Sequence, residues 1–160
     1  MTSRTPVQLQ PATPDQAALL TSLAHAAKRH WGYPESWIEA WTGQLTISPD
    51  SIVSRPTIVA WSGNRVVGFY QLAPVGRSLR LDHLWVHPKS MRQGVGTVLF
   101  NDACRRGGAL GWADLRIVSE PQATGFYERQ GATRIASEPD VIDGQLRELP
   151  VLLVPLNRAR

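Results

Sequence analysis

The chain has 160 residues, of which 42% are hydrophobic and 19% charged, and its formal net charge is +4. These values are typical of a folded soluble protein with one domain. A basic balance favours anionic partners, but the Lys and Arg residues are scattered, whereas nucleic-acid-binding proteins usually concentrate them on one surface. The charge therefore favours a small anionic ligand over nucleic acid, and an ordinary solvated surface would explain it equally well.

Membrane, disulfide and metal chemistry are not expected. No segment approaches the roughly 20 consecutive apolar residues of a membrane helix, and residues 1–6 lack the apolar core of a signal peptide. The single cysteine, Cys104, excludes an internal disulfide and fits a reducing compartment. No Cys/His cluster has the spacing of a zinc site. We therefore expect one cytoplasmic domain spanning residues 1–160.

The first half of the chain predicts a short strand, two helices and then three strands. These elements cover residues 7–10, 13–31, 35–42, 57–61, 65–73 and 78–86. A capping box marks the first helix, because Thr13 can cap it and Gln16 follows three residues later. Apolar residues then recur at helical spacing up to Trp31. Glycine-containing turns between the three strands indicate hairpins.

The third of these strands contains a change of phase. Leu79 and Leu81 place apolar side chains at odd positions. After residues 82–83, the apolar residues Leu84 and Val86 fall at even positions. A slip of one residue in a period of two is what a β-bulge produces. We therefore expect a bulge at Asp82-His83, where a side chain can be redirected.

The second half predicts a helix, a strand, a short helix and two final strands. Their ranges are residues 94–109, 114–119, 121–129, 132–137 and 148–156. Hairpins combined with one strand–helix–strand crossover indicate an α/β sandwich around a largely antiparallel sheet.

The first candidate site is the loop at residues 91–97, MRQGVGT, between a strand and a helix. Glycine lets a ligand approach the backbone closely, and the start of a helix offers unpaired N–H groups that bind phosphate. Arg92 can add a charge-assisted contact. The spacing matches neither a Walker loop nor the dinucleotide fingerprint. Taken alone, the two glycines are also explained by a tight turn.

The second candidate site is residues 125–131, GFYERQG, on the predicted short helix. An aromatic pair on such a helix is usually a core anchor. Tyr127, however, carries a phenol with an ordinary pKa of about 10, which makes it a neutral proton donor. It could protonate a departing thiolate, whose thiol has an ordinary pKa of about 8.5.

Together, these segments resemble the GNAT N-acetyltransferase superfamily. The resemblance rests on the order of the strand ending LWVHP (residues 84–88), the loop RQGVG (92–96), a later strand and the segment FYERQGA (126–132). It covers about residues 66–136. It implies an α/β (α+β) fold with a mixed, mostly antiparallel sheet of about six to seven strands. About four helices would flank this sheet, and one pair of strands would splay apart.

The resemblance also implies a site for acetyl-CoA as cosubstrate. Backbone N–H groups of the loop would cradle the pyrophosphate, and the pantetheine arm would lie between the splayed strands, pairing with the bulged one. A free N–H there could stabilise an oxyanion. Met91 stands where the family usually has Arg or Gln, and Gln122 where many members have Asn. The implied binding residues are Leu84, Trp85, Val86, Met91, Arg92, Gln93, Gly94, Val95, Gly96, Thr97 and Gln122.

Catalysis would require an acid and a base. Tyr127 matches the family tyrosine that protonates the CoA sulfur. An alkylamine has a pKa near 10.4, so a base or a water chain must remove a proton from it. Asp82 and His83, at the expected bulge, are the candidates, although His83 is equally well explained as a structural histidine. His30 and Glu35 are weaker alternatives.

The acceptor site is expected near the first two helices, with His30, Trp31 and Tyr33 as its candidate residues. An aromatic cluster could hold an apolar amine, or a cation through cation–π contact. For Trp37 and Trp41 we favour a core position. Cys104, within the helix after the loop, is expected to be a buried, inert thiol.

The resulting prediction is an N-acetyltransferase that transfers the acetyl group of acetyl-CoA directly to a primary amine of a small molecule or peptide. The alternative is a non-catalytic acyl-CoA sensor, against which the presence of Tyr127 argues, because a sensor needs no proton donor. No nucleic-acid or membrane partner and no metal is expected, and a homodimer is left open.

Overall fold

The computed structural model describes residues 6–157. Residues 1–5, most of the segment tested for a signal peptide, lie outside this range. The described elements, in chain order, are β1 (Val7–Pro11), η1 (Pro14–Gln16), α1 (Ala17–His30), α2 (Glu35–Ala40), α3 (Thr42–Leu45), α4 (Pro49–Ser54), β2 (Thr57–Ser62), β3 (Arg65–Val75), β4 (Ser78–Val86), η2 (Pro88–Ser90), α5 (Val95–Ala109), β5 (Asp114–Val118), η3 (Pro121–Ala123), α6 (Thr124–Arg129), β6 (Thr133–Ile142) and β7 (Gln145–Pro155), where η denotes a 3-10 helix.

The seven described strands form one sheet in the order β1-β2-β3-β4-β5-β7-β6. Neighbouring strands are antiparallel except β4 and β5, which are parallel. Helix α5 is the crossover between these two strands, as a parallel pair requires. The expected α/β fold with a mixed, mostly antiparallel sheet is therefore confirmed.

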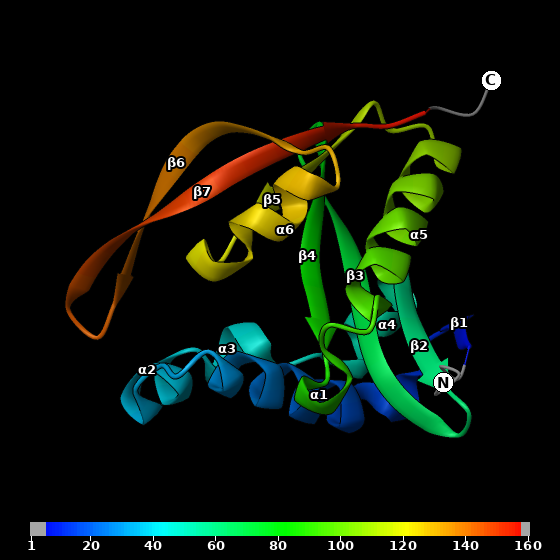
Figure 1. The fold of residues 1–160 in the computed structure, drawn as a ribbon, viewed down its shortest axis with the longest axis horizontal. Coiled ribbons are helices and arrows are strands. Elements are labelled where there is room, and N and C mark those ends of the chain that lie inside the picture. Colours follow the sequence, from blue (N-terminus) through cyan, green and yellow to red (C-terminus); the bar gives the residue numbers. More distant parts are fainter. Residues whose placement is uncertain (1–5, 158–160) are drawn as a thin grey trace.

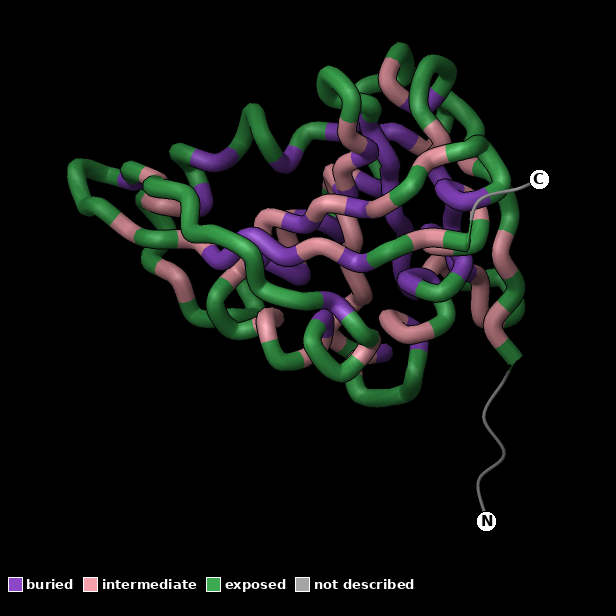
Figure 2. Tube along the Cα trace, turned by 90° about the horizontal axis from the view of Figure 1, so that it is seen from above, coloured by how far each residue is buried: buried purple, intermediate pink, exposed green. Residues whose placement is uncertain are grey.

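Two hydrophobic cores lie on opposite faces of the sheet. One joins the sheet to α5 and α6 and contains Leu99, Phe100 and Tyr127. The other joins it to α1–α4 and contains Leu20, Trp41 and Phe69. The buried parts of the chain gather in the middle of the molecule, as Figure 2 shows. The core position expected for Trp41 is thus confirmed.

The β6–β7 hairpin projects from the sheet on the side of α2 and α3 (Figure 1). It is longer than the sequence predicts, because residues 138–147 belong to it as well. That part of the prediction is wrong for a physical reason: β6 is an edge strand with mostly exposed residues. Pro139 is tolerated at such an edge, and no alternation of buried side chains marks the strand.

The helices of the first half also differ from the prediction. The segment expected as one helix over residues 35–42 is divided into α2 and α3, and α4 follows where none is expected. Ser48 caps α4 by accepting a hydrogen bond from the Ser51 N–H, and Pro49 occupies its first position. The structure describes six α-helices, where about four are expected.

Two large apolar residues at helical spacing in the first helix and in the helix after the loop are partly exposed. Trp31 at the end of α1 is 37% exposed and Val98 in α5 is 40% exposed. Other apolar residues of both helices are buried, such as Leu23 in α1 and Leu99 in α5. The helical periodicity of the apolar residues is therefore correct, but each helix buries a narrower face than the sequence pattern indicates.

Candidate functional site

The sheet opens between β4 and β5. These two strands pair only at Leu79 with Leu115 and at Arg80 with Arg116. Beyond that point β4 continues along β3, while β5 continues along β7. The expected splayed pair is therefore present, and it leaves the inner edges of residues 81–86 and 117–118 unpaired with each other.

The bulge lies in β4 at the predicted position. Gln71 of β3 pairs with His83, but the next residue, Leu72, pairs with Leu81, so Asp82 is the extra residue. After it, the His87 N–H donates to the Val67 carbonyl on the β3 side. Because residues of an antiparallel strand alternate in direction, the N–H groups of Leu84 and Val86 face the opening instead.

The loop after β4 presents a second set of backbone donors. Gly94 adopts a left-handed φ of 85° as the N-cap of α5, and Arg92 has a φ of 64°. Within residues 6–157, the N–H groups of residues 94–97 donate to no protein acceptor. The first turn of any helix has such groups, and the positive end of the helix dipole lies at the same place. Together they favour the binding of an anion. The side chain of Gln93 donates to the Lys89 carbonyl at 3.4 Å.

Helix α6 packs against the start of α5 and so brings the two predicted candidate segments together. Gln130 Nε2 donates to Thr97 Oγ1 at 3.2 Å. A Cβ on Gly96 would lie 3.4 Å from the Phe126 ring. Phe126 stacks edge-on with Tyr127 at 5.1 Å between ring centroids. Tyr127 is therefore held beside the loop.

Tyr127 itself is only 8% exposed, and its hydroxyl has no hydrogen-bond partner among the described residues. Burial, followed by the negative charge of Glu120, raises the pKa of this hydroxyl. The group is consequently protonated at neutral pH. A protonated phenol without a protein acceptor can donate its proton to a ligand.

The predicted bases, Asp82 and His83, are held in a fixed arrangement. Trp85 Nε1 donates to His83 Nδ1 at 3.0 Å, so the neutral ring carries its proton on Nε2. That nitrogen faces Asp82 Oδ2 at 4.0 Å, and Arg55 also binds Oδ2, at 3.3 Å. Burial lowers the pKa of His83, and Asp82 opposes this shift. Asp82 Oδ1 is left as the oxygen without a protein partner among the described residues.

A buried charge cluster, which the sequence did not predict, follows β5. Glu120 forms an ion pair with Lys28 of α1, and its other oxygen accepts a hydrogen bond from Tyr33 at 2.5 Å. The Tyr33 hydroxyl oxygen also lies 2.9 Å from the side-chain amide of Gln122. Arg147 of β7 lies 3.8 Å from Glu120. Because these residues come from α1, the loop after it, the segment after β5 and β7, the cluster ties α1 and the β6–β7 hairpin to the end of β5.

The aromatic cluster of the first two helices is occupied by the protein's own cations. Lys28 Nζ lies 3.8 Å from the centroid of the Trp41 ring. The Arg147 guanidinium carbon lies 5.1 to 5.5 Å from the rings of Trp41, Trp37 and Tyr33. These distances are in the range of cation–π contact. The rings therefore stabilise a structural ion cluster in this state of the protein.

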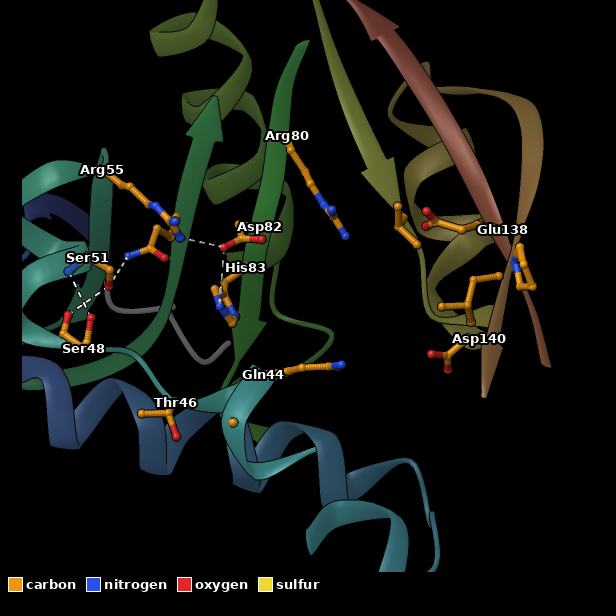
Figure 3. Close-up of a pocket in the computed structure, with 15 residues that line it drawn as sticks. Gln44, Thr46, Ser48, Ser51, Arg55, Arg80, Asp82, His83, Glu138 and Asp140 are labelled. Atoms are coloured by element: carbon orange, nitrogen blue, oxygen red, sulfur yellow. Dashed lines mark hydrogen bonds and ion pairs between the residues drawn. The ribbon is translucent and has the colours of Figure 1, made fainter. Parts of the chain in front are cut away.

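A cavity of about 630 Å³ lies on the α1–α4 side of the opening. Figure 3 shows Asp82 and His83 of β4 on one side of it and Glu138 and Asp140 of β6 on the other. Val118, at the end of β5, also lines it, which places the cavity at the splayed pair. The acceptor candidates His30, Trp31 and Tyr33 are not among its lining residues; their role stays a prediction.

Other reactive groups contribute little to this site. Cys104 is half-buried, and burial raises the pKa of its thiol to about 11, which makes it a poor nucleophile. Within residues 6–157 no group of three or more His, Cys, Asp or Glu residues could hold a metal ion. None of the described helices is both long and apolar enough to span a membrane.

Comparison with known proteins agrees with this geometry. Residues 54–131 match the family model described as "Acetyltransferase (GNAT) domain". No curated protein sequence matches the chain significantly.

Several solved structures have the same fold. One from Rhodopseudomonas palustris, described as a GCN5-related N-acetyltransferase and class-II aminotransferase, has a TM-score of 0.80 and 22% identity over 98% of this chain and 99% of that chain. The PaiA N-acetyltransferase of Thermoplasma acidophilum, in complex with coenzyme A, has a TM-score of 0.80 and 16% identity over 94% and 99%. The ribosomal-protein-S18-alanine N-acetyltransferase of Escherichia coli has a TM-score of 0.68 and 17% identity over 97% of each chain.

The family model covers the bulged strand, the loop, α5 and α6, which are the elements that build the site. The solved structures add the same fold over nearly the whole chain. Residues 54–131 thus match a domain of the GNAT acetyltransferases, a family of acyltransferases that use acetyl-CoA, and the solved structures share its fold over nearly the whole chain.

Proposed function

We propose that this chain transfers the acetyl group of acetyl-CoA directly to a primary amine of a small molecule or peptide. The observation that carries the proposal is the combination of free backbone donors with a proton donor. The N–H groups of residues 94–97 open α5, those of Leu84 and Val86 face the splayed pair, and the Tyr127 hydroxyl lacks a protein partner.

The chain has the groups that acetyl-CoA binding needs. The N–H groups of residues 94–97 fit a pyrophosphate, because they combine unpaired donors with the positive end of a helix dipole. The unpaired edge of β4 fits an arm that carries amide groups, which can form the hydrogen bonds that β5 does not supply. When bound, acetyl-CoA supplies an acetyl group activated as a thioester.

The residues around the opening can then act on the two reacting partners. The Leu84 and Val86 N–H groups can stabilise negative charge that develops on the carbonyl oxygen. Tyr127 can donate its proton to the departing sulfur, and Asp82 Oδ1 can accept the proton that the amine loses. Asp82 is favoured over His83 as the group that receives this proton, because His83 Nδ1 already accepts from Trp85 and Nε2 of the neutral ring carries a proton.

A sensor that binds acyl-CoA without turnover is the competing function. Release of free thiol on mixing the protein with acetyl-CoA and an amine library distinguishes the two. We expect thiol release for at least one class of amine, whereas thermal stabilisation by acetyl-CoA without thiol release for any amine would favour the sensor.

Tyr127→Phe provides the matched test of the acid. We expect kcat to fall roughly 10²- to 10⁴-fold, the usual contribution of a general acid. CoA affinity, measured by calorimetry, should change little, because the phenyl ring keeps its contacts with Phe100 and Phe126. An equal loss of turnover and affinity would show that the ring has only a structural role.

A further inference from the structure

The cavity beside the opening contains charged groups that the protein leaves unpaired. Within residues 6–157, Arg80 and Glu138 line the cavity and form no ion pair. Arg55 and Asp140, by contrast, are paired with Asp82 and Arg147. Figure 3 shows the Arg80 side chain extending from β4 into the space between β4 and the β6–β7 hairpin.

Arg80 lies where the splayed pair begins. It is the last residue of β4 that pairs with β5, and its partner in the register is Arg116. Neighbouring residues of paired strands point to the same face of a sheet. Arg116 also forms no ion pair among the described residues. Two guanidinium groups without an ion pair in the described part of the chain therefore lie where the splayed pair begins, and that of Arg80, which lines the cavity, favours an anionic ligand group.

The candidate bases Asp82 and His83 line the same cavity as Arg80. His83 follows Arg80 by three residues, and a strand rises about 3.3 Å per residue. The Cα positions of Arg80 and His83 are therefore about 10 Å apart along the strand, and both side chains line the same cavity. A single small molecule can place one group at Arg80 and another beside Asp82 and His83.

Resting on the proposed acetyl transfer, we propose that the acceptor is an amino acid, whose carboxylate binds Arg80 and whose amine lies beside Asp82 at the splayed pair. The planar guanidinium can bind a carboxylate through two parallel hydrogen bonds. The negative charge of Asp82 complements the ammonium group before its proton is lost. The cavity volume of about 630 Å³ leaves room for the amino-acid side chain.

The test compares a panel of free L-amino acids with the corresponding amino-acid amides. The amide has the less basic amine, so it reacts more readily unless its missing carboxylate matters. We expect kcat/KM, measured by release of free thiol, to be at least roughly 10-fold higher for the best acid than for its amide. A preference for the amide, or no preference, would overturn the proposal.

Arg80→Gln should abolish this preference by lowering kcat/KM for the acid roughly 10- to 100-fold, as expected for a hydrogen bond to a charged group. Arg77→Gln, in the exposed turn before β4, removes the same charge outside the cavity and should leave the preference intact. CoA affinity should be unchanged in both variants. If Arg80→Gln keeps the wild-type preference, Arg80 does not bind the carboxylate.

A binding measurement separates this proposal from the proposed function. Calorimetric titration of the protein–CoA complex with the acid and with the amide requires no turnover. The acid should bind more tightly than the amide, and Arg80→Gln should remove this difference; that result would support the proposal even if no thiol were released. Absence of thiol release would then refute only the proposed acetyl transfer. Absence of acid binding would overturn the proposal, while turnover of amides would still support acetyl transfer.

Discussion

Replacing Glu120 by glutamine should destabilise the protein, because Glu120 is the counter-ion of a buried lysine. The side chains of Lys28 and Glu120 are 6% and 18% exposed. Removal of one partner from a buried ion pair typically costs about 3–5 kcal/mol, since the other charge is left uncompensated. Glutamine keeps an oxygen that can accept from Lys28, so we expect the lower end, about 3 kcal/mol.

Urea unfolding at pH 7 measures this loss. With a slope of about 2 kcal/mol per molar urea, the midpoint should fall by about 1.5 M. Glu35→Gln is the matched control, because the Arg29–Glu35 pair has side chains that are 52% and 61% exposed. Exposed pairs contribute about 0–1 kcal/mol. Adding Lys28→Met to Glu120→Gln should recover at least about 1 kcal/mol, because neither charge of the pair then remains.

The pH dependence provides an independent check. Burial lowers the pKa of Lys28, and Glu120 raises it again. Without Glu120 the pKa of Lys28 in the folded state falls further below its unfolded value, so the unfolded chain binds more protons between the two values. Stability of the variant then rises with pH in that range, and its deficit should narrow as the pH rises from neutral toward the ordinary lysine pKa of about 10.4. A deficit equal to that of Glu35→Gln, and independent of pH, would refute the role assigned to the cluster.

Three further substitutions test the loop, the base and the packing. Gly94→Asp should weaken CoA binding at least roughly 10-fold in calorimetry while Gly94→Asn retains it, because both residues tolerate a left-handed φ and differ only in charge; equal affinities would place the pyrophosphate elsewhere. Asp82→Asn should lower kcat/KM roughly 10²-fold across the pH range. An unchanged plateau, with only the acidic limb moved to lower pH, would identify His83 as the base, because Asp82 raises the pKa of His83. Gly108→Ala should lower the free energy of unfolding by about 1–3 kcal/mol, because its Cβ would lie 2.2 Å from a backbone oxygen; Gly43→Ala, with no atom within 4 Å, should not do so.

Local sequence patterns predict the parts of the candidate site that could be identified without the structure. The bulge shows as a phase change within β4, and the loop proposed to bind the pyrophosphate shows as glycines at a strand–helix junction. The phenol of Tyr127 marks it as a candidate proton donor, while its match to the tyrosine that protonates the CoA sulfur follows from the family resemblance. The structure adds that its hydroxyl has no protein partner, which no local pattern reveals.

The charge cluster and the cavity depend on contacts between distant segments. Lys28 and Glu120 are separated by 92 residues, and Tyr33 and Arg147 by 114. No periodicity links such positions. A local signal did exist for Glu120, since a carboxylate directly follows a buried strand. Arg80 gave no signal, because a single arginine in an alternating strand is typical of an exposed face.

Two residue pairs are all that join β4 to β5. The ladder of backbone hydrogen bonds is thus nearly interrupted in the middle of the sheet. An amide-bearing arm bound there would supply the missing hydrogen bonds. Occupancy and rigidity would then be linked thermodynamically, because a ligand that binds only the folded state stabilises it in proportion to the logarithm of its concentration. Hydrogen exchange along the inner edges of these two strands would therefore slow as the cosubstrate accumulates, which makes the ligand a temporary strand of the protein.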